Sequence, residues 1–365
     1  MKSQSTASER IGYILLLVVI LLVVGVAITG VILFKGMRAA PPVVVSPLPT
    51  ITMPPTPVLA SSLPPEKKAV PTTTVSASAS PVPLAIIPFA PSDTATLEIP
   101  SATPDFCASL PKNWWMDMPV VPKISHNVKV IYKKGQAMGA DPTHISKVGD
   151  CQSIRQYFFG NFDDPQAYRI GPYDYLNPAI DYFHGSFDRL SLAVKTGWNV
   201  ASVLSPLNAN PTLCGVNETP LECEYRIWNP SIAIISMETW TKNRPTDTYK
   251  EYLRQIVQYS IDHGVVPILA TKADNLEGDQ SINASIACLA RQYDVPLWNF
   301  WKEVQPLPDH GLLADGFHLT NDHNRYDLKS AMQAAWPHRN LTALMAVDAV
   351  WRAVTGQAPP PDIPH

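Results

Sequence analysis

An unbroken apolar segment, residues 11–34, constrains this chain most. It reads IGYILLLVVILLVVGVAITGVILF and contains no charged residue. A helix that crosses a bilayer needs about 20 such residues, whereas the apolar core of a cleaved signal peptide spans roughly 7–15 residues. We therefore predict a single transmembrane anchor at 11–34 behind a short cytoplasmic segment, residues 1–10. Cleavage near Ala39-Ala40 is the weaker alternative.

Residues 35–104 form a segment rich in Pro, Ser, Thr, Val and Ala, with few charges. Such a composition predicts an extended, partly polyproline linker. Basic residues flank the apolar segment on both sides, so the positive-inside rule does not decide its orientation. The linker decides it instead, because linkers of this composition are typical of domains held outside a membrane. We expect a single-pass protein of the cell membrane with an extracytoplasmic C-terminal domain. The net charge of -3 argues against a nucleic acid partner.

The five cysteines fit an oxidising compartment. Cys214 and Cys223 enclose a short turn-rich stretch, GVNETPLE, and are predicted to form a disulfide. At most one more pair forms among Cys107, Cys151 and Cys288, which leaves one thiol free or paired between chains.

Residues 105–356 have a globular composition, followed by a flexible tail, residues 357–365. Short apolar runs predict five strands, at 144–149, 191–194, 232–237, 265–271 and 296–301. Helical spacing predicts helices at 245–263, 281–293 and 341–354. Strands that alternate with helices imply an α/β fold whose parallel sheet is covered on both faces. Ligands of such sheets bind outside the carboxyl ends of the strands.

The segments after these strands carry residues suited to acyl transfer. Cys151, in Gly-Asp-Cys-Gln-Ser, follows the first strand at a predicted helix start, where the helix dipole lowers a thiol pKa. His318 lies three residues after Asp315, a spacing that lets the carboxylate orient the imidazole. Gly197 follows a neighbouring strand and offers an unobstructed backbone N–H to an oxyanion.

Together these blocks resemble the SGNH/GDSL hydrolases, from about Ile145 to the last helix. The resemblance implies a three-layer α/β/α, flavodoxin-like sandwich with a parallel sheet. It also implies a nucleophile at Cys151, where the family has serine, a base at His318 and an orienting acid at Asp315. The backbone N–H groups of Cys151 and Gly197 are then the oxyanion donors. The implied activity is an esterase acting on acyl esters of carbohydrate or cell-envelope material, without a metal or cofactor.

Two departures from the family pattern leave an alternative open. The third block reads Glu-Thr-Trp-Thr, so Trp240 replaces the usual oxyanion asparagine. Asn243, further along that loop, is the only other amide nearby. The alternative is an inactive binding or scaffold domain in which Cys151 is bonded to Cys107 or Cys288.

Six further polar or aromatic residues are expected to line a cleft at the strand ends: Asp150, Asn199, Trp240, Asn243, Asp274 and Asn275. The acidic cluster that begins at Asp274 has oxygen ligands suited to Ca²⁺, but its spacing matches no known calcium loop, and a cleft is preferred. Trp298 and Trp301 are predicted to belong to the core rather than to a sugar site.

Overall fold

The computed structural model describes residues 106–361 except 108, 112, 241 and 242. All of these belong to one compact unit, Asp93–His365. The predicted anchor and linker lie outside the described residues. Within the described part of the chain, no helix has the length and apolar character needed to cross a bilayer.

The fold is mixed α/β and contains a parallel sheet, as predicted. Its four strands are β1 (Asp141–Gly149), β3 (Pro230–Ser236), β4 (Val266–Ala270) and β5 (Leu297–Trp298), in the order β1-β3-β4-β5. Ile145 pairs with Ile232, and Ile235 with Leu269. β3 and β4 are buried along their whole length. These continuous apolar runs fit strands that are covered on both faces.

Two of the predicted strands differ in the structure. Residues 191–194 form no strand, because only one parallel bridge, Gly149 to Val194, joins this segment to the sheet. The run at 296–301 divides, since Asn299 accepts a hydrogen bond from the Lys302 N–H and begins helix α7 (Phe300–Val304). Helix capping therefore ends β5 after two residues.

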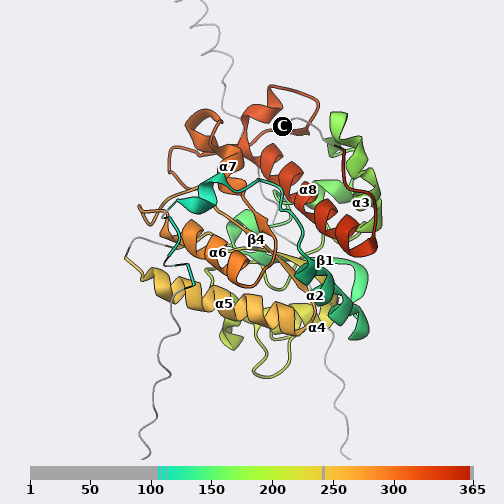
Figure 1. The fold of residues 1–365 in the computed structure, drawn as a ribbon, viewed down its shortest axis with the longest axis vertical. Helices are drawn as coiled ribbons and strands as arrows, with labels where there is room; N and C mark the ends of the chain where they lie inside the picture. Colours follow the sequence, from blue (N-terminus) through green and yellow to red (C-terminus); the bar gives the residue numbers. More distant parts are fainter. Residues whose placement is uncertain (1–105, 108, 112, 241–242, 362–365) are drawn as a thin grey trace, which may run out of the picture. The chain divides into compact units, whose positions relative to one another are not determined.

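The predicted helices are present. α5 (Thr246–Asp262) buries Tyr249, Leu253, Ile256, Val257 and Ser260 along one face. α6 (Ser281–Gln292) packs beside α5, and α8 (Ala335–Thr355) begins earlier than predicted. In Figure 1, α5 and α8 lie on opposite sides of the strands.

Three further helices and a second sheet of two strands belong to the described part of the chain. They are α2 (His126–Ala137), α3 (Asn177–Tyr182), α4 (Pro220–Trp228) and the two-stranded parallel sheet of β2 (Tyr168–Arg169) and β6 (Asn324–Arg325). The 3-10 helices span Trp114–Asp117, Cys151–Ser153, Gly160–Asp163, Gly171–Leu176, Ser202–Leu204, Pro206–Asn208, Pro308–Gly311 and Ala331–Gln333.

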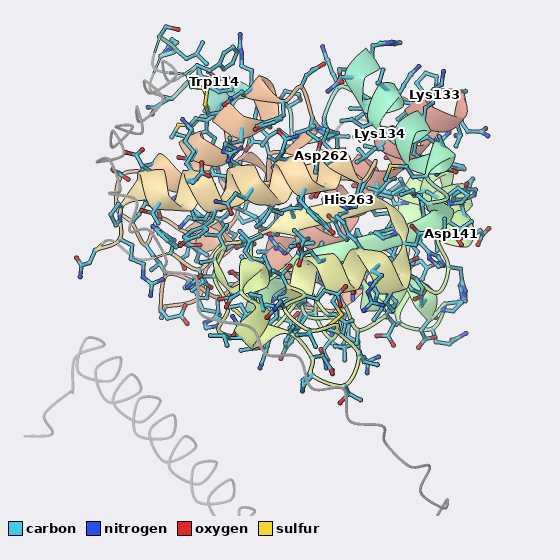
Figure 2. The ribbon with its side chains drawn as sticks, turned by 90° about the horizontal axis from the view of Figure 1, so that it is seen from below. Trp114, Lys133, Lys134, Asp141, Asp262 and His263 are labelled. Atoms are coloured by element: carbon cyan, nitrogen blue, oxygen red, sulfur yellow. A yellow bond between two sulfur atoms is a disulfide. The ribbon has the colours of Figure 1, made fainter. Side chains whose placement is uncertain are left out.

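Helix α2 packs against the C-terminal end of α5. Lys134 Nζ donates to the Ile261 carbonyl at 3.1 Å and lies near Asp262 (Figure 2). A Cβ atom on Gly135 would stand 2.2 Å from the Gly264 carbonyl oxygen, so this close approach requires glycine.

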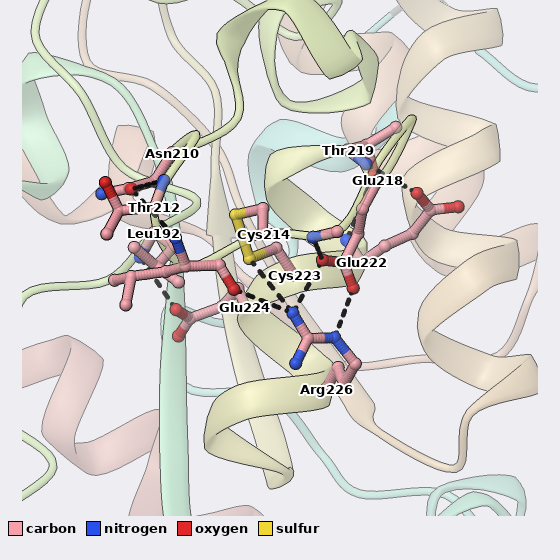
Figure 3. The surroundings of a disulfide bond; sticks show 12 residues. Leu192, Asn210, Thr212, Cys214, Glu218, Thr219, Glu222, Cys223, Glu224 and Arg226 are labelled. Carbon is pink, nitrogen blue, oxygen red and sulfur yellow. Dashed lines mark hydrogen bonds and ion pairs between the residues drawn. A yellow bond between two sulfur atoms is a disulfide. The ribbon is translucent and has the colours of Figure 1, made fainter. Parts of the chain in front are cut away.

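Two disulfides join the described cysteines. Cys214 pairs with Cys223, as predicted, and Arg226 forms a bidentate pair with Glu218 beside this bond (Figure 3). Cys107 pairs with Cys288, and Cys151 is free. The alternative in which Cys151 is disulfide-bonded is therefore wrong.

The two disulfides are expected to stabilise the domain unequally. The Cys107–Cys288 bond spans 181 residues and the Cys214–Cys223 bond spans 9. Since the entropy removed from the unfolded chain grows with loop length, losing the long link should cost about 3–5 kcal/mol and losing the short one about 2–3 kcal/mol. Urea unfolding of the double variants Cys107→Ser/Cys288→Ser and Cys214→Ser/Cys223→Ser measures this. An equal or larger loss from the short link would contradict the assignment.

Candidate active site

Cys151 lies directly after β1 and is the first residue of the 3-10 helix η2 (Cys151–Ser153). Its thiol is free and partly exposed. Ser153, two residues further along, is buried, and its Oγ lies 3.4 Å from the Ser236 carbonyl oxygen. Of these two side chains, only Cys151 is open to a substrate.

The pKa of the Cys151 thiol is raised, which corrects the prediction of a lowered value. Burial raises it to about 12, and the carboxylates of Asp150 and Glu238 add to the effect. A helix of three residues aligns few peptide dipoles, so it does not offset the desolvation of a thiolate. At neutral pH this thiol is protonated.

Asp150 joins the ends of β1 and β3. Its fully buried Oδ2 accepts hydrogen bonds from the backbone N–H groups of Glu238 and Thr239, both at 2.8 Å, and from Thr239 Oγ1 at 2.9 Å. Its Oδ1 accepts from the Gln152 N–H at 3.0 Å. Asp150 is therefore a structural acceptor beneath the site, not the cleft residue that was expected.

Asp315 and His318 form the predicted pair. Asp315 Oδ2 lies 2.6 Å from His318 Nδ1, and Asp315 Oδ1 accepts from the backbone N–H groups of Phe317 and His318 at 3.0 Å each. The hydrogen bond from His318, together with these two backbone bonds, lowers the pKa of Asp315 to about 2. The ionised carboxylate favours the tautomer with the proton on Nδ1, which leaves Nε2 as the base. Both side chains are about half exposed.

The structure brings the Cys151 segment and the His318 segment together through one hydrogen bond. Gln152 Nε2 donates to the Phe317 carbonyl at 3.0 Å. Within the described residues, no hydrogen bond joins Cys151 to His318 directly. Such a gap does not argue against a catalytic pair, because hydrogen bonds of catalytic groups are often formed only when substrate is bound.

Gly197 lies on a loop beside the end of β1. The Gly149 N–H donates to the Ala193 carbonyl at 3.0 Å, which places this loop next to the Cys151 turn. Gly197 has a φ of 81°, in the left-handed region that favours glycine. In the described part of the chain, neither the Cys151 N–H nor the Gly197 N–H donates to another residue, and their role as oxyanion donors stays a prediction.

Trp240 is a core residue and not the cleft residue that was expected. Its ring is 3% exposed, packs edge-on against Tyr249, and donates from Nε1 to the Arg244 carbonyl at 3.3 Å. Asn243 is exposed and adjoins residues outside the description. Asn199 is half-buried, and its Oδ1 accepts from the Ala201 N–H at 3.0 Å.

The acidic segment after β4 forms an internal ion-pair cluster. Lys272 Nζ lies 2.7 Å from Asp274 Oδ1 and 2.5 Å from Glu277 Oε2, and Asp274 is fully buried. Asn275 is exposed and accepts the Gln280 N–H at 2.9 Å. Because Asp274 is buried and paired with Lys272, it does not line the expected cleft, whereas the cleft role of Asn275 stays a prediction. Trp298 is fully buried, which confirms its place in the core.

A buried Arg339 on α8 was not predicted from the sequence. Its Nη2 lies 2.6 Å from Glu238 Oε1 and donates to Ser236 Oγ at 2.8 Å, and its Nε donates to the Gln152 carbonyl at 3.2 Å. The guanidinium also lies over four aromatic rings, those of Phe158, Trp298, Phe300 and Trp336. No motif marks Arg339. The available signal was helical spacing that places it on the face of buried Ala343 and Ala346.

Comparisons with known proteins add little at this point. No protein-family model and no curated protein matches the chain. One similar solved structure belongs to a protein assigned to the G-D-S-L lipolytic family of Desulfitobacterium hafniense DCB-2. The likeness covers 56% of this chain and 99% of that chain, with 13% identity and a TM-score of 0.33. At these values the likeness carries no argument about function.

The raised pKa predicts slow alkylation of Cys151. With both disulfides intact, iodoacetamide reacts with this thiol alone, because only the thiolate is nucleophilic. We expect the rate in the folded protein to rise about tenfold per pH unit from pH 7 to pH 10 without a plateau. The urea-unfolded, unreduced chain is the control and should level off near the ordinary pKa of 9.0. A plateau below pH 9 in the folded protein would contradict the raised pKa.

Glu238 predicts a pH dependence of stability. Burial raises its pKa to about 7 from an ordinary 4.5; Arg339 opposes the shift, and Asp150 and Asp274 reinforce it. The folded state therefore holds a proton that the unfolded state releases between these two values. This contribution is fully present below pH 4.5 and is lost as the pH rises through 7.

Urea unfolding of the wild type and of Glu238→Gln at pH 5 and pH 8 measures the effect. The stability of the wild type relative to the variant should fall with rising pH by at most about 3 kcal/mol. A constant difference between the two proteins would show that Glu238 does not titrate in this range.

Proposed function

We propose that this chain is a membrane-anchored, extracytoplasmic ester hydrolase of the SGNH type. Its fold is then the three-layer, flavodoxin-like sandwich of that family. Its substrates are acyl esters of carbohydrate or cell-envelope material. The observation that carries the proposal is the Asp315–His318 pair, whose loop is bonded to the Cys151 turn through Gln152. Two disulfides in the domain support an oxidising, extracytoplasmic location.

The reaction begins from a neutral thiol. As Cys151 Sγ attacks the ester carbonyl carbon, its proton passes to His318 Nε2, and Asp315 stabilises the imidazolium through Nδ1–H. The N–H groups of Cys151 and Gly197 hold the oxyanion. The intermediate collapses to a thioester, and His318 donates its proton to the departing alcohol.

Hydrolysis of the thioester repeats these roles. His318 Nε2 removes a proton from a water molecule, whose oxygen attacks the thioester carbon. The carbon–sulfur bond then breaks, and the sulfur regains the proton from His318. The site lacks the asparagine that usually serves as a further oxyanion donor. The absence of one such donor lowers the rate by on the order of 10²–10³.

A binding or scaffold domain is the second candidate function. Two features favour it: burial raises the pKa of the thiol to about 12, and the ring of Trp240, where an oxyanion asparagine was sought, lies in the core. This candidate predicts no turnover of any ester, together with retained binding of envelope carbohydrate.

The two functions separate in an assay of the full chain in detergent micelles with p-nitrophenyl acetate. Cys151→Ala and His318→Ala should each lower kcat by about 10²-fold or more. The kcat of Cys151→Ser should stay well above the kcat of Cys151→Ala. The wild-type thiol and the introduced hydroxyl both start protonated, so both depend on His318 to remove the proton.

His323→Ala is the matched control. His323 forms an analogous exposed pair with Asp322, at 3.0 Å from Nδ1 to Oδ1, and has no role in the proposed reaction. Its removal should leave kcat unchanged. Equal rates in the wild type, Cys151→Ala and His318→Ala would exclude the proposed triad.

A further inference from the structure

Gln152 stands between the nucleophile and the interior of the domain. Cys151 before it is partly exposed, whereas the Gln152 side chain is 1% exposed. The carboxamide therefore faces the interior and does not line the substrate side. The proposed reaction gives it no role.

Hydrogen bonds join Gln152 to its own turn and to two distant segments. Its backbone N–H donates to Asp150 Oδ1 at the end of β1, and its backbone carbonyl accepts from Arg339 Nε on α8. Its Nε2 donates to the Phe317 carbonyl, 165 positions along the chain. Phe317 lies between Asp315 and His318, so the last bond reaches the base loop itself.

The base loop, residues 313–318, has few other connections. The Leu313 N–H donates to the His318 carbonyl at 2.8 Å, and the Gly316 N–H to the Leu313 carbonyl at 2.9 Å. The three remaining bonds run between Asp315 and residues 317 and 318. In the described part of the chain, the Gln152 bond is therefore the only hydrogen bond that joins this loop to any residue outside it.

The position of the Gln152 carboxamide also lowers the stability of the domain. Gln152 Oε1 is buried and has no hydrogen-bond partner within the described residues. An unsatisfied buried acceptor lowers stability, and an apolar side chain of similar volume avoids this cost. Filling space does not explain a glutamine at this position, whereas a bond to the base loop does.

We propose that Gln152 is a positioning residue that holds the base loop against the nucleophile turn, so that His318 Nε2 stays within reach of Cys151. Arg339 holds the Gln152 backbone in place by donating a hydrogen bond from Nε to its carbonyl. The effect on catalysis rests on the proposed hydrolase function. The link between Gln152 and the base loop does not depend on it. Displacement of a general base by about 1 Å can cost on the order of 10² in rate.

Gln152→Met tests the role in turnover. It keeps the volume and removes both the donor and the unsatisfied oxygen, so the thermal midpoint should change little. We expect kcat for p-nitrophenyl acetate to fall on the order of 10- to 100-fold, with KM within about twofold of the wild type. Gln305→Met is the matched control, because Gln305 Nε2 donates to the Trp301 carbonyl at 2.9 Å, within one helical segment. It should leave kcat unchanged.

Gln152→Glu supplies a readout that packing alone would not change. The introduced carboxyl can donate to the Phe317 carbonyl only while it is protonated. The ratio of kcat in this variant to kcat in the wild type should therefore be highest at low pH and fall as the pH rises. A ratio that is constant with pH would overturn the positioning role.

Hydrogen exchange tests the link without turnover. Deuterium uptake at the Phe317 and His318 amides should be about tenfold faster or more in Gln152→Met than in the wild type, and unchanged in Gln305→Met. If uptake rises but no protein hydrolyses ester, the link stands and the hydrolase function fails. Unchanged uptake overturns the proposal whatever the kinetics, and so does faster uptake with an unchanged kcat in an active enzyme.

Discussion

The carboxylate of Asp150 fixes the geometry on which the rest of the site depends. It is fully buried, yet each oxygen accepts hydrogen bonds, from Gln152 on one side and from Glu238 and Thr239 on the other. These donors belong to segments that follow two different strands, so one side chain sets the position of the nucleophile turn relative to the end of β3. A buried carboxylate with its lone pairs satisfied in this way tolerates few substitutions.

Burial explains the raised pKa of the thiol first, and the carboxylates of Asp150 and Glu238 reinforce it. Burial raises the pKa values of both Glu238 and Asp274, and neighbouring carboxylates raise them further. Arg339 pairs with the first and Lys272 with the second. A thiolate at Cys151 would add another anion to this group at the cost of desolvation, so the site favours proton transfer during attack over a preformed ion pair.

The sequence predicted those features that depend on local patterns. Apolar runs between turn residues identified β1, β3 and β4, and the three-residue spacing identified the Asp315–His318 pair. Helix α4 was within reach as well, because Thr219 and Glu222 form a capping box at its start.

The remaining features depend on which segments meet in space. No local pattern shows that Trp240 turns into the core or that Lys272 neutralises Asp274. The thiol pKa was predicted in the wrong direction because it depends first on burial, then on the adjacent Asp150, and also on Glu238, which is distant in the sequence. A short motif shows neither the burial of a side chain nor its distant neighbours.

In the proposed reaction, a cysteine nucleophile and an oxyanion site without an asparagine make the rate depend most on His318. A thiolate leaves a tetrahedral intermediate more readily than an alkoxide, so the intermediate returns to reactants unless the alcohol is protonated promptly. With only two backbone donors for the oxyanion, the intermediate is also less stable. Formation of the thioester then depends on how closely His318 Nε2 is held to the departing oxygen. His318 lies on an exposed loop, and among the described residues Gln152 alone makes a hydrogen bond to residues 313–318 from outside them. In the proposed reaction, the position of His318 therefore limits the rate more than the acidity of the thiol does.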